Sequence, residues 1–157
     1  MPAGPRNSSD VKAGRAFVLM DRSLDRAEFG PRWLSDDRIA REIIGAFHFG
    51  QHQLGFFELY AFVIMPNHVH LLLQPRVPLA RITKSLKRYT ARRANQILDR
   101  TGSPFWQYES FDHWVRNERE LQRIINYIEC NPVAAGLVGK SEEWRWSSAY
   151  KVLELQA

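Results

Sequence analysis

Residues 55–73, GFFELYAFVIMPNHVHLLL, contain two apolar runs on either side of the dipeptide Pro66-Asn67. The first run, 55–65, is rich in aromatic and branched side chains, which favour strands. The second run, 68–73, follows a break that is short enough for a tight turn. We therefore predict two neighbouring antiparallel strands, with a pair of histidines at the beginning of the second.

The pattern on both sides of this hairpin predicts five further elements. The expected order is strand 14–20, helix 36–49, strand 55–65, strand 68–73, helix 79–98, strand 110–116 and helix 118–131. Asp36 can cap the first helix and Asn117 the last, which we expect Asn131-Pro132 to end. This order is the split βαβ, ferredoxin-like pattern, and it predicts an α+β fold with helices on one face of an antiparallel sheet.

Length and composition fit a single domain of residues 14–157 behind a flexible tail of residues 1–13. The tail is polar and rich in Pro, Gly and Ser, and it has no apolar centre of the kind found in signal peptides. No apolar run reaches the roughly 18 residues of a membrane span, so no membrane partner is expected. Cys130 is the single cysteine and has no disulfide partner in the chain. A reducing, cytoplasmic location is therefore expected.

A basic charge balance, formally +5, favours a polyanionic partner. The predicted helix 79–98 holds many of the cations, and we propose as contacts to nucleic acid Arg81, Lys84, Lys87, Arg88, Arg92 and Arg93. Acidic residues are nearly absent there, which argues against a salt-bridged surface, although a plain solvated face is an alternative. Tyr89 follows the apolar stripe of the same helix and is interpreted as a core residue.

His68 and His70 lie two residues apart in a predicted strand, where side chains alternate between the two faces. Both rings then point to one face, roughly 6.6 to 7 Å apart along the chain. Two imidazoles at that spacing can share one divalent cation, with a third ligand supplied from elsewhere. The pair is equally compatible with two ordinary half-buried histidines.

Tyr127 and Asn131 lie four residues apart on the last predicted helix, so their side chains stack one above the other. They fall at the flank of the helix's apolar face and can look toward the sheet. The carbonyl oxygen of Asn131 is a hard ligand suited to Mg²⁺ or Mn²⁺. Alternatively, Tyr127 is a boundary tyrosine with a wet hydroxyl and Asn131 is a plain helix terminator.

Four segments carry a family pattern: AFVIMPNHVHLLL at 61–73, FWQYESFDHWVR at 105–116, YIECNPVAAGLV at 127–138 and WRWSSAY at 144–150. Together they closely resemble the REP-associated tyrosine transposases, which are IS200-like relatives of the single-tyrosine transposases in the HUH superfamily. The PNHVHLLL block is the most specific part of the resemblance. Glu129 and Cys130 depart from it, because bulkier or apolar residues are common at those two positions.

The resemblance implies a role for each candidate residue. His68 and His70 match the histidines that bind the divalent metal, Tyr127 matches the tyrosine that attacks DNA, and Asn131 matches the third metal ligand. The family's usual substrate is single-stranded DNA with repetitive extragenic palindromes that fold into hairpins. The implied reaction is strand cleavage through a 5′-phosphotyrosine bond, which a second DNA 3′-hydroxyl can reverse at a new junction.

The expected partner is single-stranded or hairpin DNA, bound by a cytoplasmic, nucleoid-associated monomer or homodimer. One alternative is a non-catalytic regulator that binds hairpin DNA, derived from a transposase. A second is a small metal-dependent hydrolase that activates water and forms no covalent bond to DNA. A third is an RNA-binding domain of ferredoxin-like fold, although the candidate strands show no aromatic pattern for stacking bases.

Overall fold

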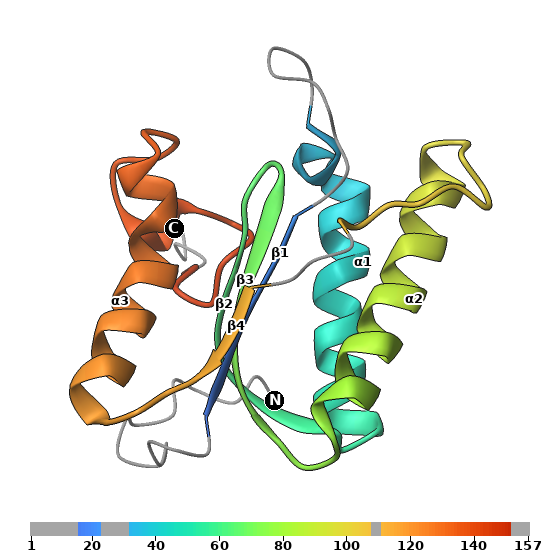
Figure 1. Cartoon of the computed structure of the whole chain (residues 1–157). Helices are drawn as coiled ribbons and strands as arrows, with labels where there is room; N and C mark the ends of the chain where they lie inside the picture. Colours follow the sequence, from blue (N-terminus) through green and yellow to red (C-terminus); the bar gives the residue numbers. More distant parts are fainter. Residues whose placement is uncertain (1–15, 23–31, 108–110, 152–157) are drawn as a thin grey trace, which may run out of the picture.

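The computed structural model describes residues 16–22, 32–107 and 111–151. Its four strands form one antiparallel sheet in the order β2-β3-β1-β4 (Figure 1). The main elements are β1 (Phe17–Arg22), α1 (Asp37–His48), β2 (Phe57–Ile64), β3 (His68–Pro75), α2 (Leu79–Ile97), β4 (Phe111–Trp114) and α3 (Glu118–Ala134). This arrangement confirms the predicted α+β class and the split βαβ order. Short helical turns at η2 (Trp33–Ser35), η3 (Phe49–Gln53) and η4 (Ser141–Glu143) were not predicted.

The β2–β3 hairpin forms as expected and places β3 in the interior of the sheet. The Met65 N–H donates to the His68 carbonyl at 2.8 Å and closes the turn at Pro66-Asn67. Along β3, His70 pairs with Val63 of β2 on one side and with Met20 of β1 on the other. The histidine pair therefore lies on a strand that is held on both sides by neighbouring strands.

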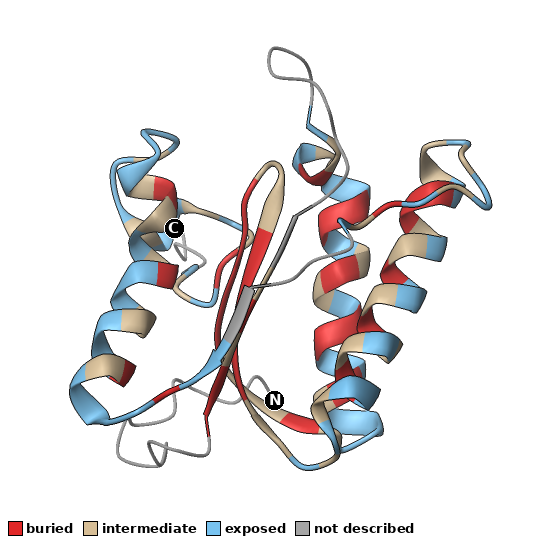
Figure 2. Cartoon of the chain, viewed as in Figure 1, coloured by how far each residue is buried: buried red, intermediate tan, exposed pale blue. Residues whose placement is uncertain are grey.

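One face of the sheet carries the larger hydrophobic core, and α1 and α2 cover it (Figures 1 and 2). Val69, Leu71 and Leu73 alternate along β3 toward these helices, and none is more than 5% exposed. Ile43 of α1 and Ile82 of α2 are 1% exposed in the same cluster. Burial of such side chains contributes about 1.5–3 kcal/mol each, so this face supplies much of the stability.

The prediction that all helices lie on one face is wrong for α3, which packs on the opposite face (Figure 1). Leu121 and Ile128 of α3 are fully buried against Ala61, Val63 and Leu72 of the β2–β3 hairpin. The physical reason is visible in β2 and β3, whose apolar runs are nearly continuous rather than alternating. Strands of that kind are buried on both faces, so a second layer must cover them.

Both predicted helix caps are confirmed, whereas the predicted end of α3 is not. Asp36 Oδ1 accepts the Arg38 N–H and Asn117 Oδ1 accepts the Glu120 N–H, each at 2.9 Å. α3 continues through Pro132 to Ala134. A proline removes one backbone donor, but the Ala135 N–H still reaches the Asn131 carbonyl at 2.9 Å and extends the last turn.

The segment after α3 closes the outer edge of β2. The Ile64 N–H donates to the Trp146 carbonyl at 2.8 Å, and Trp144 Nε1–H donates to the Ile64 carbonyl at 3.0 Å. Val63 forms an isolated antiparallel bridge with Ser147. The WRWSSAY segment thus has a structural role, because it pairs an edge that would otherwise expose unpaired backbone groups.

Two predictions lie at the limits of the described ranges. The tail of residues 1–13 and the first two residues of the predicted strand 14–20 are outside them. No helix within the described ranges is long and apolar enough to cross a bilayer.

Candidate functional site

His68 and His70 share the face of the sheet that α3 covers. Their ring centroids are 4.9 Å apart and their planes are perpendicular, which confirms that alternation along β3 brings both rings together. His70 is 5% exposed and His68 is half-buried. Leu72, two residues further along β3, belongs to the α3-facing cluster, so the three side chains form one row on this face.

Tyr127 of α3 lies directly beside this pair. Its ring centroid is 5.4 Å from that of His70 in an edge-to-face arrangement with an interplanar angle of 87°. The side chain is nevertheless 62% exposed, because it lies at the flank of α3 rather than on the buried stripe of Leu121 and Ile128. A phenol that touches a buried histidine and is open to solvent can be approached by a large substrate.

Asn131 follows Tyr127 by one helical turn and is half-buried. In the described residues there is no group of three or more His, Cys, Asp or Glu side chains that could hold a metal ion. A cation shared by His68 and His70 would therefore need a third protein ligand of another kind. The amide oxygen of Asn131 is a candidate of the right chemistry on the correct helix flank.

Asn67 contacts the histidine pair, which the sequence did not predict. Its side-chain oxygen lies 2.7 Å from Nδ1 of His68, and because an amide oxygen only accepts, a hydrogen bond between them requires the tautomer with the proton on Nδ1. The lone pair of the neutral ring is then on Nε2, which is the state that a metal ligand needs. The sequence places Asn67 directly before the histidine pair, but the Pro66-Asn67 dipeptide by itself predicts only a turn.

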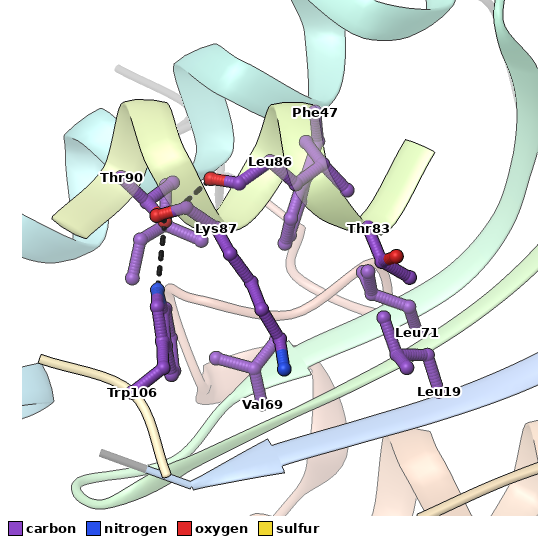
Figure 3. Close-up of a pocket in the computed structure, with 10 residues that line it drawn as sticks. Leu19, Phe47, Val69, Leu71, Thr83, Leu86, Lys87, Thr90 and Trp106 are labelled. Atoms are coloured by element: carbon purple, nitrogen blue, oxygen red, sulfur yellow. Dashed lines mark hydrogen bonds between the residues drawn. The ribbon is translucent and has the colours of Figure 1, made fainter. Parts of the chain in front are cut away.

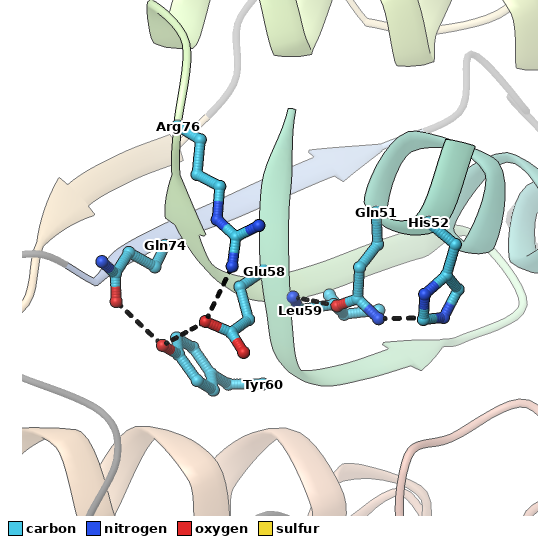
Figure 4. A network of polar contacts seen from close by, with 7 residues as sticks. All are labelled: Gln51, His52, Glu58, Leu59, Tyr60, Gln74 and Arg76. Atoms are coloured by element: carbon cyan, nitrogen blue, oxygen red, sulfur yellow. Dashed lines mark hydrogen bonds and ion pairs between the residues drawn. The ribbon is translucent and has the colours of Figure 1, made fainter. Parts of the chain in front are cut away.

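The same sheet face becomes polar again at the far end of the hairpin. The Tyr60 hydroxyl lies 2.8 Å from Oε1 of Gln74 and 3.3 Å from Oε2 of Glu58 (Figure 4). Arg76 forms an ion pair with Glu58 at 3.5 Å. Gln74 continues the row of His68, His70 and Leu72, so the α3-facing side of β3 is polar at both ends and apolar between them.

The six cations proposed as nucleic-acid contacts separate into two groups on α2. The cationic ridge, defined as Arg81, Lys84, Arg88 and Arg92, is exposed and lines one hollow together with Phe56, Ser85 and Tyr89. These four cations have no carboxylate partner in the described part of the chain. Arg93 is different, because its Nη2 lies 2.9 Å from Oε1 of Glu42 on α1 and holds the pKa of that carboxyl below its usual value.

Lys87 also lies away from the cationic ridge. Its side chain extends along Val69 toward the sheet, at a small apolar cavity beside Thr90 and Trp106 (Figure 3). The Trp106 Nε1–H donates to the Thr90 hydroxyl at 3.0 Å in the same place. The spacing of three and four residues that defines the ridge excludes Lys87 and Arg93, and in the structure these two lie on opposite flanks of α2.

The interpretation of Tyr89 as a core residue is wrong. Its side chain is 41% exposed, and its hydroxyl lies 3.3 Å from Oε2 of Glu42. Tyr89 falls at the edge of the apolar stripe of α2, on the side where α2 meets Glu42 of α1. It is on the opposite layer from His68 and His70.

The candidate site and the cationic ridge therefore lie on different layers of the molecule (Figure 1). The structure brings together His68, His70 and Tyr127, with Asn131 one turn further on α3. It does not bring the ridge of α2 to them, because the sheet lies between.

Comparison with known families gives a match over most of this architecture. The family described as "Transposase IS200 like" matches residues 33–131, which is more than half of the chain. The matched range contains His68, His70, Tyr127 and Asn131 together with the whole of α2.

Two individual proteins are similar to this chain, one in sequence and one in structure. A curated protein of Haemophilus influenzae, whose name assigns it to the REP-associated tyrosine transposases, is 28% identical over 106 residues. That alignment covers 60% of this chain, and the chain spans only about 60% of the relative's length. A solved structure described as a REP-associated tyrosine transposase bound to a REP hairpin superposes with a TM-score of 0.64 at 19% identity, covering 94% of this chain and 82% of that one. This structural match shows that the two chains share a fold.

Proposed function

Because the chain belongs to the IS200-like transposase family, we propose that it is a metal-dependent single-strand DNA endonuclease and strand transferase acting on hairpin-forming palindromic DNA. The observation that carries this proposal is the position of Tyr127, 5.4 Å from His70 between ring centroids in the same chain. The nucleophile and the histidines that would hold the cation then belong to one molecule. We infer that the reaction proceeds within a single chain, whether the protein is a monomer or a homodimer.

In the proposed reaction the Tyr127 oxygen attacks the scissile phosphorus in line with the leaving 3′-oxygen. The phenol loses its proton, a 5′-phosphotyrosine bond forms, and the 3′-oxygen leaves as a hydroxyl. The covalent bond conserves the energy of the phosphodiester, so a second 3′-hydroxyl can attack it and release Tyr127. The exposure of the Tyr127 ring supports this role, because a DNA strand must reach its hydroxyl.

His68, His70 and Asn131 are the residues that would hold a divalent cation, Mg²⁺ or Mn²⁺. The fit rests on the close approach of the two rings and on the Asn67 contact. With the proton on Nδ1, the lone pair that would bind the cation lies on Nε2 of His68. When bound, the cation supplies positive charge that offsets the charge developing on the phosphate oxygens. Burial of His70 keeps this ring in one orientation before DNA arrives.

The substrate class is inferred from the relatives and from the charge of the molecule. The solved relative is described as bound to a REP hairpin, and hairpin DNA is the corresponding substrate proposed for this chain. We propose that the cationic ridge of α2 contacts DNA backbone outside the cleavage site. Lys87 and Arg93 are expected to contribute less than the ridge to this contact. Changing Lys84, Arg88 and Arg92 to Ala should weaken binding to hairpins of any sequence and flatten its salt dependence.

A non-catalytic regulator of hairpin DNA is the second candidate function. It would need the fold and the cationic ridge, but it would have no use for the contact between Tyr127 and His70. The intact set of His68, His70, Tyr127 and Asn131 favours the enzyme.

Tyr127→Phe tests the proposal most directly, because it keeps the ring beside His70 and removes only the hydroxyl. We expect DNA binding and folding to persist, since an exposed hydroxyl contributes little net stability. Incubation of the wild-type protein with single-stranded hairpins and Mn²⁺ should give a covalent adduct that survives denaturation, and the variant should give neither adduct nor cleavage.

Tyr89→Phe is the matched control and should retain both adduct and cleavage. An adduct formed by the Tyr127→Phe protein would move the nucleophile to another residue. Cleavage by the wild-type protein without any adduct would favour the hydrolase that activates water.

A further inference from the structure

An apolar hollow of about 310 Å³ opens where η3 and the start of β2 meet α2. Its floor is formed by Phe57, Ile82 and Leu86, which are at most 9% exposed. Its rim carries Phe49 and Leu54, which are 55% and 41% exposed. Large apolar side chains left open around a hollow of this size are typical of binding sites.

The cationic ridge continues directly from this hollow. The apolar hollow borders a second hollow, which the cationic ridge lines. Both hollows are lined by Phe56, Ser85 and Tyr89. The guanidinium of Arg81 lies over the Phe56 ring at 4.8 Å, and that of Arg92 lies 6.0 Å from the centre of the Tyr89 ring. An apolar cavity and a row of cations therefore form one continuous surface.

The lining of the apolar hollow discriminates between the ligands that such a surface could take. Among the lining side chains only Ser85 and Tyr89 carry a polar group, and the Tyr89 hydroxyl is already 3.3 Å from Glu42. A nucleobase that entered would lose water from its donors and acceptors without finding partners, at a cost of about 1–3 kcal/mol for each group. A phenylalanine, leucine or isoleucine side chain has no such groups to satisfy.

We propose that this surface binds an acidic peptide segment of a partner protein, with a large apolar side chain in the hollow and carboxylates on the cationic ridge. Apolar anchors set in a charged rim are a recurring way to recognise peptides. The surface lies on the layer opposite His68, His70 and Tyr127, so a bound peptide leaves that site open. The DNA contact of the cationic ridge rests on the proposed function. If the ridge makes that contact, the peptide and DNA compete for the ridge.

The test uses a fluorescein-labelled peptide of ten residues with one Phe and one Leu among aspartates, titrated with the whole protein and followed by anisotropy. The double variant Phe49→Ser/Leu54→Ser should bind it about tenfold more weakly, a loss of about 1.4 kcal/mol, because it removes apolar surface that would cover the peptide's anchor. A peptide with lysines in place of the aspartates should not bind. The matched control is Leu137→Ser/Tyr150→Ser, which changes residues that are 44% and 40% exposed on the α3 side and should bind as the wild type does.

A second arm removes charge. Lys84→Ala/Arg88→Ala/Arg92→Ala should weaken peptide binding, whereas Arg116→Ala/Arg119→Ala/Lys140→Ala, which removes equal charge elsewhere, should not. Equal peptide affinity in the Phe49/Leu54 variant and its control would overturn the proposal. So would a Phe49/Leu54 variant that loses affinity for single-stranded DNA but not for the peptide, since nucleic acid would then be the occupant. The titration needs neither metal nor DNA, so its outcome is independent of whether hairpins are cleaved.

Discussion

The two faces of the sheet are built from the same strands but have different tasks. On β3, Val69, Leu71 and Leu73 point to α1 and α2 and join the larger core, whereas His68 and His70 point to α3. Residues adjacent in sequence therefore differ in what they contribute. The first face is packed almost entirely with apolar side chains, and the second combines a smaller apolar cluster with the candidate site and the Tyr60 network.

The contrast between the two faces explains how a small domain can hold a polar site and keep its core. A strand in the interior of a sheet exposes its residues alternately to the two faces. If one face supplies most of the buried apolar area, the other can carry histidines and a half-buried amide at little cost to stability. Changes on the two faces should then affect different measurements, and the following predictions test this separation.

The largest effect is expected at the histidines. His68→Ala and His70→Ala should each abolish hairpin cleavage, because each removes a ligand of the cation that would stabilise charge on the reacting phosphate. Far-UV circular dichroism should remain that of the folded protein, and hairpin binding should persist. Unchanged cleavage by either variant in the presence of a chelator would contradict the metal hypothesis.

Leu71→Ala changes the neighbouring residue on the opposite face, where the side chain is 3% exposed. We expect the free energy of unfolding to fall by about 2–5 kcal/mol, the usual range for a buried leucine. Denaturant unfolding measures this change, and cleavage per folded molecule should remain close to that of the wild type. Leu137→Ala is the control, since its side chain is 44% exposed and should change stability by less than about 0.5 kcal/mol. A comparable loss in both variants would mean that the α1/α2 face is not the stabilising one.

Asn67→Ala should have an intermediate effect that is specific to the α3 face. Loss of the 2.7 Å contact to Nδ1 of His68 frees the ring to change tautomer, and such losses typically weaken metal binding about 10–100-fold. Titration calorimetry with Mn²⁺ measures the metal affinity directly. Asn67→Asp keeps an acceptor oxygen and should bind Mn²⁺ more tightly than Asn67→Ala does. Wild-type Mn²⁺ affinity in Asn67→Ala would exclude Asn67 from a positioning role.

The smallest effect concerns Glu129, on the flank of α3 away from Tyr127. Burial raises the pKa of its carboxyl above the ordinary value of 4.5, while a 3.2 Å hydrogen bond from the Ser148 hydroxyl opposes this shift. The folded state holds the proton more tightly than the unfolded state. Its contribution to stability is therefore complete below pH 4.5 and is lost as pH rises through the folded pKa.

Glu129→Gln removes this charge and keeps an oxygen for Ser148. The variant should melt at a slightly higher temperature than the wild type at neutral pH, and the difference should disappear below pH 4.5. Thermal unfolding followed at several pH values measures both. A difference that does not depend on pH would show that ionisation of Glu129 is not its cause. Cleavage should be unaffected, because Glu129 contacts the C-terminal segment rather than Tyr127.

Much of this architecture follows from local pattern. The hairpin around Pro66-Asn67, the caps Asp36 and Asn117, and the shared face of His68 and His70 depend on turn chemistry and on strand and helix periods. Those properties act over a few residues, so a sequence displays them directly. The identification of Tyr127 and Asn131 as one helical row is of the same kind.

Other features depend on which surfaces meet. A helical period gives the direction of a side chain from its own axis, but not the layer on which the helix packs. The exposure of Tyr89 could not be predicted for this reason, and neither could the contacts of Lys87 and Arg93, because the surroundings of all three depend on α1 and the sheet as well as on α2.

The order of strands and helices, the common direction of the two histidines and the basic character of α2 can all be predicted from the sequence, since each depends on short-range spacing. Three features become visible only in the folded chain: α3 packs on the face opposite α1 and α2, Tyr127 contacts His70, and the cationic ridge lies on the other layer. The physical reason is that both faces of the β2–β3 hairpin are apolar and each must be covered, and burial of the second face is what carries Tyr127 to the histidines.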